Sequence, residues 1–216
     1  MACRVVVFTA LFLLSACREN KTTPAADNKT ISFSDDSTLI FNGSSLDNWE
    51  ITNFGPQGPV SVSGGELILG MGDGCTGVTY KGSVPLNNYE ISLEARRREG
   101  NDFFCGITFP VQTEFCTFIA GGWGGATVGL SCIDGKDAAE NETTTLRNFE
   151  RNRWYGIRIR VTDNMIEAWI DNEKVVALSA KGKKLSVRAE VTLSKPLGLA
   201  SWNTVAGIRN VRLKKI

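Results

Sequence analysis

Histidine is absent from all 216 residues of the chain. This absence excludes a Ser-His-Asp or Cys-His nucleophile system. It also excludes zinc and non-haem iron centres that depend on histidine ligands. Any acid–base chemistry must therefore come from Asp, Glu, Lys, Tyr or Cys side chains.

The chain also lacks an excess of charge of either sign. It has 24 Lys and Arg against 23 Asp and Glu, and residues 1–16 contribute only Arg4. A nucleic-acid partner would require a basic face, so we expect no nucleic-acid binding. The same balance argues against electrostatic attachment to a membrane. The basic run at residues 96–98 is interpreted as a solvated face.

One cysteine motif and one carboxylate motif are also absent. Neither the CxxC pairs of zinc sites nor the Glu-x-Asp-x-x-Glu pattern of laminarinase-like glycosidases occurs. A metal site and a retaining glycosidase of that kind are therefore disfavoured. Beyond residue 17 the cysteines are Cys75, Cys105, Cys116 and Cys132. Cys105 and Cys116 flank a predicted turn at residues 110–114, so they either form a disulfide across a hairpin or are buried free thiols.

No apolar run at the N-terminus is long enough to span a bilayer, which takes about 20 residues. The run at residues 5–14 follows Arg4 and is succeeded by Ser15, Ala16 and Cys17. This order is typical of a bacterial lipoprotein signal, with an ordinary signal peptide as the alternative. We predict that residues 1–16 are a signal peptide and that Cys17 is lipidated.

Lipidation of Cys17 would make the lipid bilayer a partner of the protein and would place the protein in the cell envelope. More than one acyl chain on Cys17 would hold the protein on the lipid bilayer. Arg18, rather than Asp, follows this cysteine, which favours the outer membrane of the cell envelope in a diderm bacterium. Residues 17–37 are polar and are expected to form a flexible tether. The globular domain is predicted at residues 38–216.

Alternation of apolar and polar residues is the main structural signal in this domain. It occurs at residues 89–96, 155–161 and 187–192, as is typical of strands with one wet face. Segments at residues 165–170 and 174–178 flank a short polar turn and predict a hairpin. The 22 glycines supply further turns.

Helical periodicity is almost missing. One short helix is expected at residues 142–149. Many short antiparallel strands predict an all-β fold in which two sheets stack face to face, a β-sandwich or jelly roll.

Segments at the two ends of the domain resemble a known family. Residues 39–49 read LIFNGSSLDNW, and residues 206–213 read AGIRNVRL. A chain that opens on LFNGxxLxxW and closes on FRNIRL resembles the 3-keto-disaccharide hydrolase domain family. Residues 89–104 and 154–172 resemble interior motifs of the same family, so the resemblance covers nearly all of residues 38–216.

The resemblance implies a concanavalin A-like jelly roll that acts on 3-keto-glycosides. Oxidation at C3 of a sugar acidifies the proton at C2, so a base can remove it and the glycosidic group can leave; water then adds. This chemistry needs a base and an enolate stabiliser but no histidine. Asn101, Asp102 and Phe103 stand where the family has NSG, which points to a different pocket or to a domain without catalysis.

Three segments supply candidate site residues. Asp102 precedes two phenylalanines that would raise the pKa of its carboxyl group, so it is a candidate base; the alternative is a turn residue. Glycines surround Trp123, and an exposed ring there fits stacking on a sugar, although a glycine-rich bulge with the ring packed inward is the alternative. Trp202 precedes the last predicted strand and either widens this platform or belongs to the core.

The loop at residues 134–142 concentrates four carboxylates. We expect Glu140 and Glu142 to be catalytic and Asn141 to bind substrate. Calcium is the cofactor that such an oxygen-rich loop suggests, although the spacing is not that of an EF-hand, and we predict no required cofactor. The alternative is a solvated loop.

We therefore predict an exported, lipid-anchored β-sandwich that breaks down (3-keto-)glycosides with carboxylate acid–base chemistry. The alternative from another class is a non-catalytic carbohydrate-binding or envelope-associated module. Both imply a saccharide ligand. A scaffold protein without a sugar site is the third hypothesis.

Overall fold

The computed structural model describes residues 1–2 and 36–216. The predicted lipidation site at Cys17, nearly all of the predicted signal peptide and most of the tether lie outside these residues. Within the described part of the chain, no helix is both long and apolar enough to cross a membrane.

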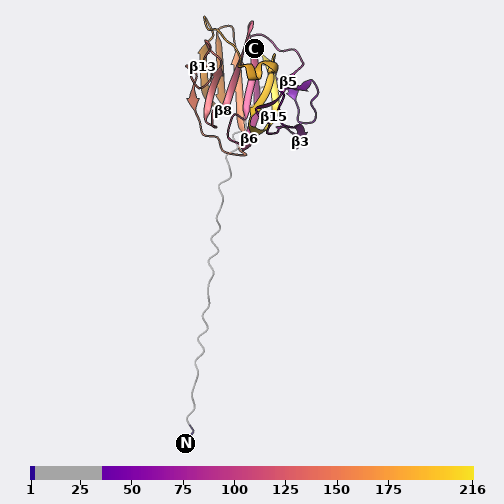
Figure 1. Ribbon diagram of the computed structural model, residues 1–216, viewed down its shortest axis with the longest axis vertical. Helices are drawn as coiled ribbons and strands as arrows, with labels where there is room; N and C mark the ends of the chain where they lie inside the picture. Colours follow the sequence, from indigo (N-terminus) through magenta and orange to yellow (C-terminus); the bar gives the residue numbers. More distant parts are fainter. Residues whose placement is uncertain (3–35) are drawn as a thin grey trace.

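Residues 36–216 form two antiparallel sheets that stack face to face (Figure 1). The eight-stranded sheet contains β1 (Thr38–Phe41), β3 (Val60–Ser63), β4 (Glu66–Leu69), β6 (Tyr89–Gly100), β11 (Tyr155–Val161), β12 (Met165–Ile170), β13 (Glu173–Ser179) and β15 (Thr204–Lys215). The seven-stranded sheet contains β2 (Trp49–Ile51), β5 (Cys75–Tyr80), β7 (Cys105–Val111), β8 (Glu114–Gly122), β9 (Thr127–Ser131), β10 (Thr145–Leu146) and β14 (Gly198–Trp202). This arrangement confirms the predicted β-sandwich.

The order of strands places sequence-distant segments side by side. The eight-stranded sheet runs β13-β12-β11-β6-β15-β4-β3, with β1 also on β15, and the seven-stranded sheet runs β10-β9-β8-β7-β14-β5-β2. The main helical element among the described residues is the 3₁₀-helix η1 (Ala189–Ser194). It interrupts the path from β13 to β14.

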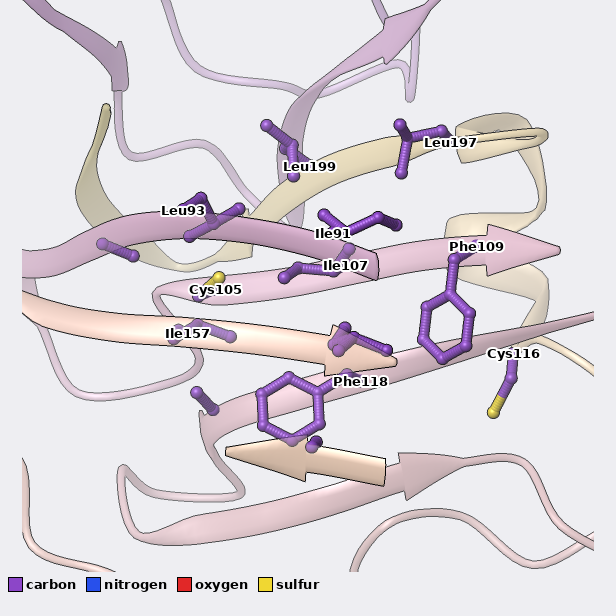
Figure 2. Packing of buried hydrophobic residues seen from close by; sticks show 14 of the residues in the cluster. Ile91, Leu93, Cys105, Ile107, Phe109, Cys116, Phe118, Ile157, Leu197 and Leu199 are labelled. Carbon is purple, nitrogen blue, oxygen red and sulfur yellow. The ribbon is translucent and has the colours of Figure 1, made fainter. Parts of the chain in front are cut away.

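The core lies between the sheets and follows the period of two. Along β6, the buried side chains of Tyr89, Ile91, Leu93 and Ala95 face inward. They meet inward-facing residues of the other sheet, such as Ile107 on β7 (Figure 2). Because alternate side chains point to opposite faces of a strand, each sheet keeps a second face free for another role.

The end motifs of the domain have the structural roles expected of them. Trp49 is 7% exposed, and its Nε1 donates a hydrogen bond to the Ile40 carbonyl at 2.8 Å. Asn42 forms a turn, since its Oδ1 accepts the Ser44 N–H at 2.9 Å. Ile208 and Val211 are fully buried. These contacts close the two ends of the chain onto the sandwich.

Most sequence-predicted elements are confirmed. The alternation at residues 89–96 and 155–161 marks β6 and β11, and the predicted hairpin is formed by β12 and β13. The turn predicted at residues 110–114 is confirmed but is shorter: β7 and β8 pair as far as Val111 and Glu114, so residues 112 and 113 form the turn.

Two predicted elements were wrong. Residues 142–149 form turns and the two-residue β10 instead of a helix, since the Asn141 carbonyl and side chain bind Thr143 and Thr144 and hold a turn. Residues 187–192 lead into η1 instead of forming a strand. Val187 and Val191 both pack on one apolar cluster, but Ala189 between them is exposed because the 3₁₀-helix begins at that residue.

Of the two alternatives for Cys105 and Cys116, a disulfide across the hairpin or buried free thiols, the structure shows the second. Both side chains are free thiols in the core. Cys105 stands opposite Ala120, and Cys116 stands opposite Phe109. Four residues of offset correspond to about 13 Å along a strand, whereas bridged Cα atoms are at most about 7 Å apart. Figure 2 shows the two side chains well apart along the hairpin.

Burial should keep these thiols unreactive in the folded protein. It raises the pKa of Cys116 to about 12 and that of Cys105 further still, and the thiolate is the reactive form. We expect Cys75, Cys105, Cys116 and Cys132 to resist alkylation under native conditions and to react fully in denaturant without a reductant. Mass spectrometry of the alkylated peptides checks this, and any peptide modified only after reduction would contradict it.

Candidate functional site

A cavity of about 250 Å³ opens on the outer face of the seven-stranded sheet. Thr117 and Ile119 of β8 and Ser131 of β9 line it, because their neighbours along each strand point into the core. Small residues of the central strands leave room on the same face. A Cβ on Gly106 of β7, for example, would lie only 3.0 Å from the Phe103 ring.

The segment that carries η1 forms one wall of this cavity. Val191 packs with Cys75 and Ile119 in a second apolar cluster, separate from the main core. Thr79 of β5 fixes the end of the segment, since its Oγ1 donates to the Leu193 carbonyl at 3.1 Å. The segment therefore covers part of the outer face and makes a pocket of it.

Asp102 lines the cavity at the turn between β6 and β7. Its Oδ1 accepts the N–H of Phe103 at 2.7 Å, and its Oδ2 accepts the N–H of Gly124 at 3.4 Å. Its own N–H donates to Thr204 Oγ1 at 3.0 Å. Within residues 36–216 this carboxylate forms no ion pair, so its position is set by backbone groups.

The two predicted tryptophans line the same cavity. Trp123 is 42% exposed and has a positive φ of 47°. Gly125 closes this turn with an N–H bond to the Gly122 carbonyl at 3.1 Å. Trp202 is half-buried, and its ring packs against the second apolar cluster. Asp102, Trp123 and Trp202 are thus brought together, as the sequence suggested.

Arg97 holds the loops of Asp102 and Trp123 in place. It is 8% exposed, and its Nη2 donates to the carbonyls of Asp102, Gly121 and Gly125 at 2.9–3.1 Å. Its guanidinium also stacks over Phe104 at 5.3 Å, and burial lowers its pKa. A side chain on Gly121, which has φ of 81°, would begin 2.5 Å from Arg97 Nη2.

Sequence reasoning missed Arg188 and Glu190, which also line the cavity. Arg188 donates to Glu190 at 2.9 Å and to Asp137 at 2.8 Å, and its guanidinium lies 5.9 Å from the Trp123 ring centroid. The hydrogen bond from Arg188 lowers the pKa of Glu190. These residues were overlooked because the segment reads as a strand with a polar outer face.

Cys75 is a further lining residue that no motif indicated. Burial, reinforced by the negative charge of Glu190, raises the pKa of its thiol to about 12. The group is therefore a neutral part of the wall at ordinary pH and no thiolate nucleophile.

The structure does not bring Glu140, Asn141 and Glu142 to the cavity. Glu142 is exposed and pairs with Lys183 at 2.5 Å. Asn141 is 8% exposed and uses its side chain inside its own loop: Nδ2 donates to the carbonyls of Leu130, Lys136 and Asp137, and Oδ1 accepts from Thr143. Asn141 organises the loop and has no group left for a ligand.

The carboxylates of this loop also give no calcium site. Asp134 and Glu142 both pair with Lys183, and Asp137 pairs with Arg188. Among the residues described, no three His, Cys, Asp or Glu side chains gather closely enough to hold a metal ion. The loop is a solvated segment braced by cations.

The chain belongs to the family described as the 3-keto-alpha-glucoside-1,2-lyase-like domain, whose model matches residues 36–214. This confirms the resemblance that the end motifs indicated. The comparison with curated proteins finds no match.

Solved structures share the fold at low sequence identity. The Crh5 transglycosylase in complex with NAG is 15% identical, with a TM-score of 0.60 over 83% of this chain and 84% of its own. The Bacillus licheniformis beta-glucanase is 11% identical, with a TM-score of 0.56 over 83% and 98%. The carbohydrate binding module CBM66 from Bacillus subtilis is 12% identical, with a TM-score of 0.52 over 78% and 96%. The fold is the concanavalin A-like jelly roll that was predicted.

Arg97 should matter for stability and its neighbour Arg98 should not. Arg97→Met would leave three carbonyls without their buried donor, and each such group costs about 1–3 kcal/mol. Arg98 is 36% exposed and lies 3.8 Å from Glu66, so Arg98→Met should change the free energy of unfolding by less than about 1 kcal/mol. Denaturant unfolding of both variants measures this, and equal losses would contradict the role given to Arg97.

Proposed function

We propose that the domain breaks down 3-keto-glycosides in the cavity on the seven-stranded sheet. The observation that carries this proposal is the convergence of Asp102, Trp123 and Trp202 on one cavity in a member of this family. The two rings offer apolar faces to a sugar, and Asp102 offers a carboxylate. No histidine is required.

The reaction begins with proton abstraction next to the ketone. The Asp102 carboxylate takes the proton from C2, the electron pair forms the C1–C2 double bond, and the C1–O bond breaks with its electrons on the leaving oxygen. The carboxylic acid formed on Asp102, or a water molecule, returns a proton to that oxygen. Addition of water to the unsaturated ketone then completes a net hydrolysis.

Asp102 fits the role of base better than Glu190 does. The Glu190 carboxylate is engaged by Arg188, whose hydrogen bond lowers its pKa and weakens it as a base. The Asp102 carboxylate is held by backbone N–H groups and forms no salt bridge among the described residues, although the buried Arg97 guanidinium attracts it electrostatically. Arg188 can instead stabilise negative charge on the enolate oxygen.

A non-catalytic carbohydrate-binding module is the second candidate. It is favoured by the exposed Trp123 ring and by the shared fold with a carbohydrate binding module. In that case the aromatic faces hold the sugar, and Asp102 only shapes the loop.

We also propose that Cys17 is lipidated and holds the domain on the cell envelope. The support is the sequence alone: the short apolar run at residues 5–14 and the small residues before Cys17. Labelling with a radioactive or clickable fatty acid in bacteria, with Cys17→Ser as the control, tests this.

Asp102→Asn should abolish most turnover of 3-keto-glucosides. The amide keeps an oxygen for the Phe103 N–H but cannot accept the proton, so the rate should fall by about 10²–10⁴-fold. Glu142→Gln is the matched control, since Glu142 pairs with Lys183 away from the cavity. Product formation from 3-keto-glucosides and from the unoxidised parents is measured. If Asp102→Asn retains full turnover, Asp102 is not the base. If the unmodified protein shows no turnover but is retained on glycan affinity gels, the domain is a carbohydrate-binding module.

Trp123→Ala should weaken saccharide binding, whichever of the two functions holds. Loss of one stacked ring removes about 0.5–1.5 kcal/mol. Trp154→Ala is the control, because that ring lies on the other sheet, 4.5 Å from the Arg96 guanidinium and 4.1 Å from that of Arg209. Calorimetry with a 3-keto-glucoside should show weaker binding only for Trp123→Ala. Equal affinities for Trp123→Ala and the parent would place the sugar elsewhere.

A further inference from the structure

The outer face of the eight-stranded sheet gathers cations from four strands. They define what we name the cationic face: Arg96, Arg98, Arg158, Arg160, Lys174, Arg209, Arg212 and Lys214. Apart from Arg212, these cations number seven, and among the described residues they pair with five carboxylates: Glu66, Glu90, Glu94, Glu167 and Asp36. The face therefore carries an excess of positive charge, although the chain as a whole has a net charge of only +1.

Two carboxylates are each shared by two guanidinium groups. Glu66 lies 2.5 Å from Arg96 and 3.8 Å from Arg98. Glu90 accepts from Arg158 at 3.0 Å and pairs with Arg160 at 3.1 Å. One negative charge cannot neutralise two positive ones, so each of these clusters keeps one positive charge.

The cations of this face are also more exposed to solvent than most of the carboxylates that pair with them. The side chains of Glu66 and Glu94 are only 10% exposed, and that of Glu90 is 15% exposed. Those of Arg98, Arg160 and Lys174 are 36–47% exposed. Glu66 and Glu90 thus lie beneath the guanidinium groups that share them, whereas Asp36 is an exposed carboxylate beside Lys214.

The N-terminal segment joins the domain at this same face. Lys214 lies 3.6 Å from Asp36, and Arg212 donates to Ser37 Oγ at 3.3 Å. Eighteen residues separate Cys17 from Asp36. Fully extended, they would reach about 60 Å, so a domain anchored at Cys17 can lay this face on the bilayer.

We propose that the cationic face docks on an anionic lipid surface. Each basic side chain near such a surface contributes to binding, and the attraction falls off within a Debye length. The strands β13 to β15 span about 19 Å across the sheet at about 4.8 Å per strand. An array this broad suits many headgroups at once better than one linear polyanion.

The proposal also fixes which way the cavity faces. The cavity lies on the outer face of the opposite sheet, so docking by the cationic face turns it away from the membrane and toward arriving saccharide. The charge argument is independent of the proposed turnover. Only the role of the N-terminal segment rests on the proposed anchor.

The test uses the full chain with Cys17→Ser, which has no acyl chain. Arg98→Gln/Arg160→Gln removes the outer guanidinium of each shared pair and leaves Glu66 with Arg96 and Glu90 with Arg158. The control, Lys81→Gln/Lys136→Gln, removes the same charge from exposed residues off this face. Co-sedimentation is measured with phosphatidylcholine vesicles, with and without phosphatidylglycerol, at low and near-physiological salt. For each protein, the partition coefficient onto vesicles with phosphatidylglycerol is divided by that onto vesicles without it. The apolar run at residues 5–14 is common to all three proteins, so its contribution cancels in this ratio.

We expect that ratio to fall by up to about 30-fold at low salt for Arg98→Gln/Arg160→Gln and to stay near the parent value for the control. Thermal unfolding checks that both variants are folded, and turnover or saccharide binding should match the parent in both. Equal losses in the two variants would show that only net charge matters and would overturn the proposal. It would also be overturned if phosphatidylglycerol had no effect, or if the cationic face retained dextran sulfate but not anionic vesicles.

Discussion

The buried guanidinium of Arg97 is the constraint on which the site depends. It comes from β6 in one sheet, reaches across the end of the sandwich, and donates to carbonyls of the two loops that present Asp102 and Trp123 on the other sheet. It forms no salt bridge among the described residues, and its charge is balanced by carbonyl dipoles, by the faces of Phe104 and Phe149 and by the nearby negative charge of Asp102. A buried charge is tolerated only with such partners, and meeting this need fixes both loops together. The glycines beside Trp123 then follow, because a side chain at Gly121 would collide with the guanidinium.

The two outer faces of the sandwich differ in the size and charge of their side chains. On the seven-stranded sheet, small or neutral residues such as Gly106, Thr117 and Ala200 clear space, and the segment carrying η1 closes over it. On the eight-stranded sheet, long basic side chains cover the outer aromatic ring: the Arg158 guanidinium lies 3.8 Å from the centroid of the Trp169 ring, and Trp169 is only 8% exposed. A ring covered by cations cannot stack on a sugar, whereas the 42% exposed ring of Trp123 can. We therefore assign the proposed saccharide site to the seven-stranded sheet.

The architecture was largely predictable from local patterns, and the site only in part. Period-two alternation identified β6 and β11, since each has one face in the core and the other on the surface, and the short polar turn between two apolar segments identified the β12–β13 hairpin. The same rule failed at residues 187–192, where Val187 and Val191 pack on one apolar cluster but Ala189 between them is exposed, because η1 begins there. Arg188 and Glu190 were overlooked for the same reason. The run at residues 96–98 was taken as one solvated face, but the pleat sends Arg97 inward and Arg96 and Arg98 outward. Glu140 and Glu142 were chosen because their loop concentrates carboxylates, which says nothing of the path of the loop between β9 and β10.

Neutrality of composition turns out to be a poor guide to electrostatics in this protein. The charges balance over the chain, yet they are sorted in space: shared carboxylates lie low under guanidinium groups on one sheet, while the cavity on the other has Asp102 and Glu190 against the single cation Arg188. In the cavity this sorting separates the two carboxylates by role. Glu190 is committed to Arg188, whereas Asp102 keeps a carboxylate held only by backbone N–H groups. In a chain without imidazole, the proposed proton abstraction requires a carboxylate that is not held in a salt bridge, and the fold places Asp102 beside the exposed ring of Trp123.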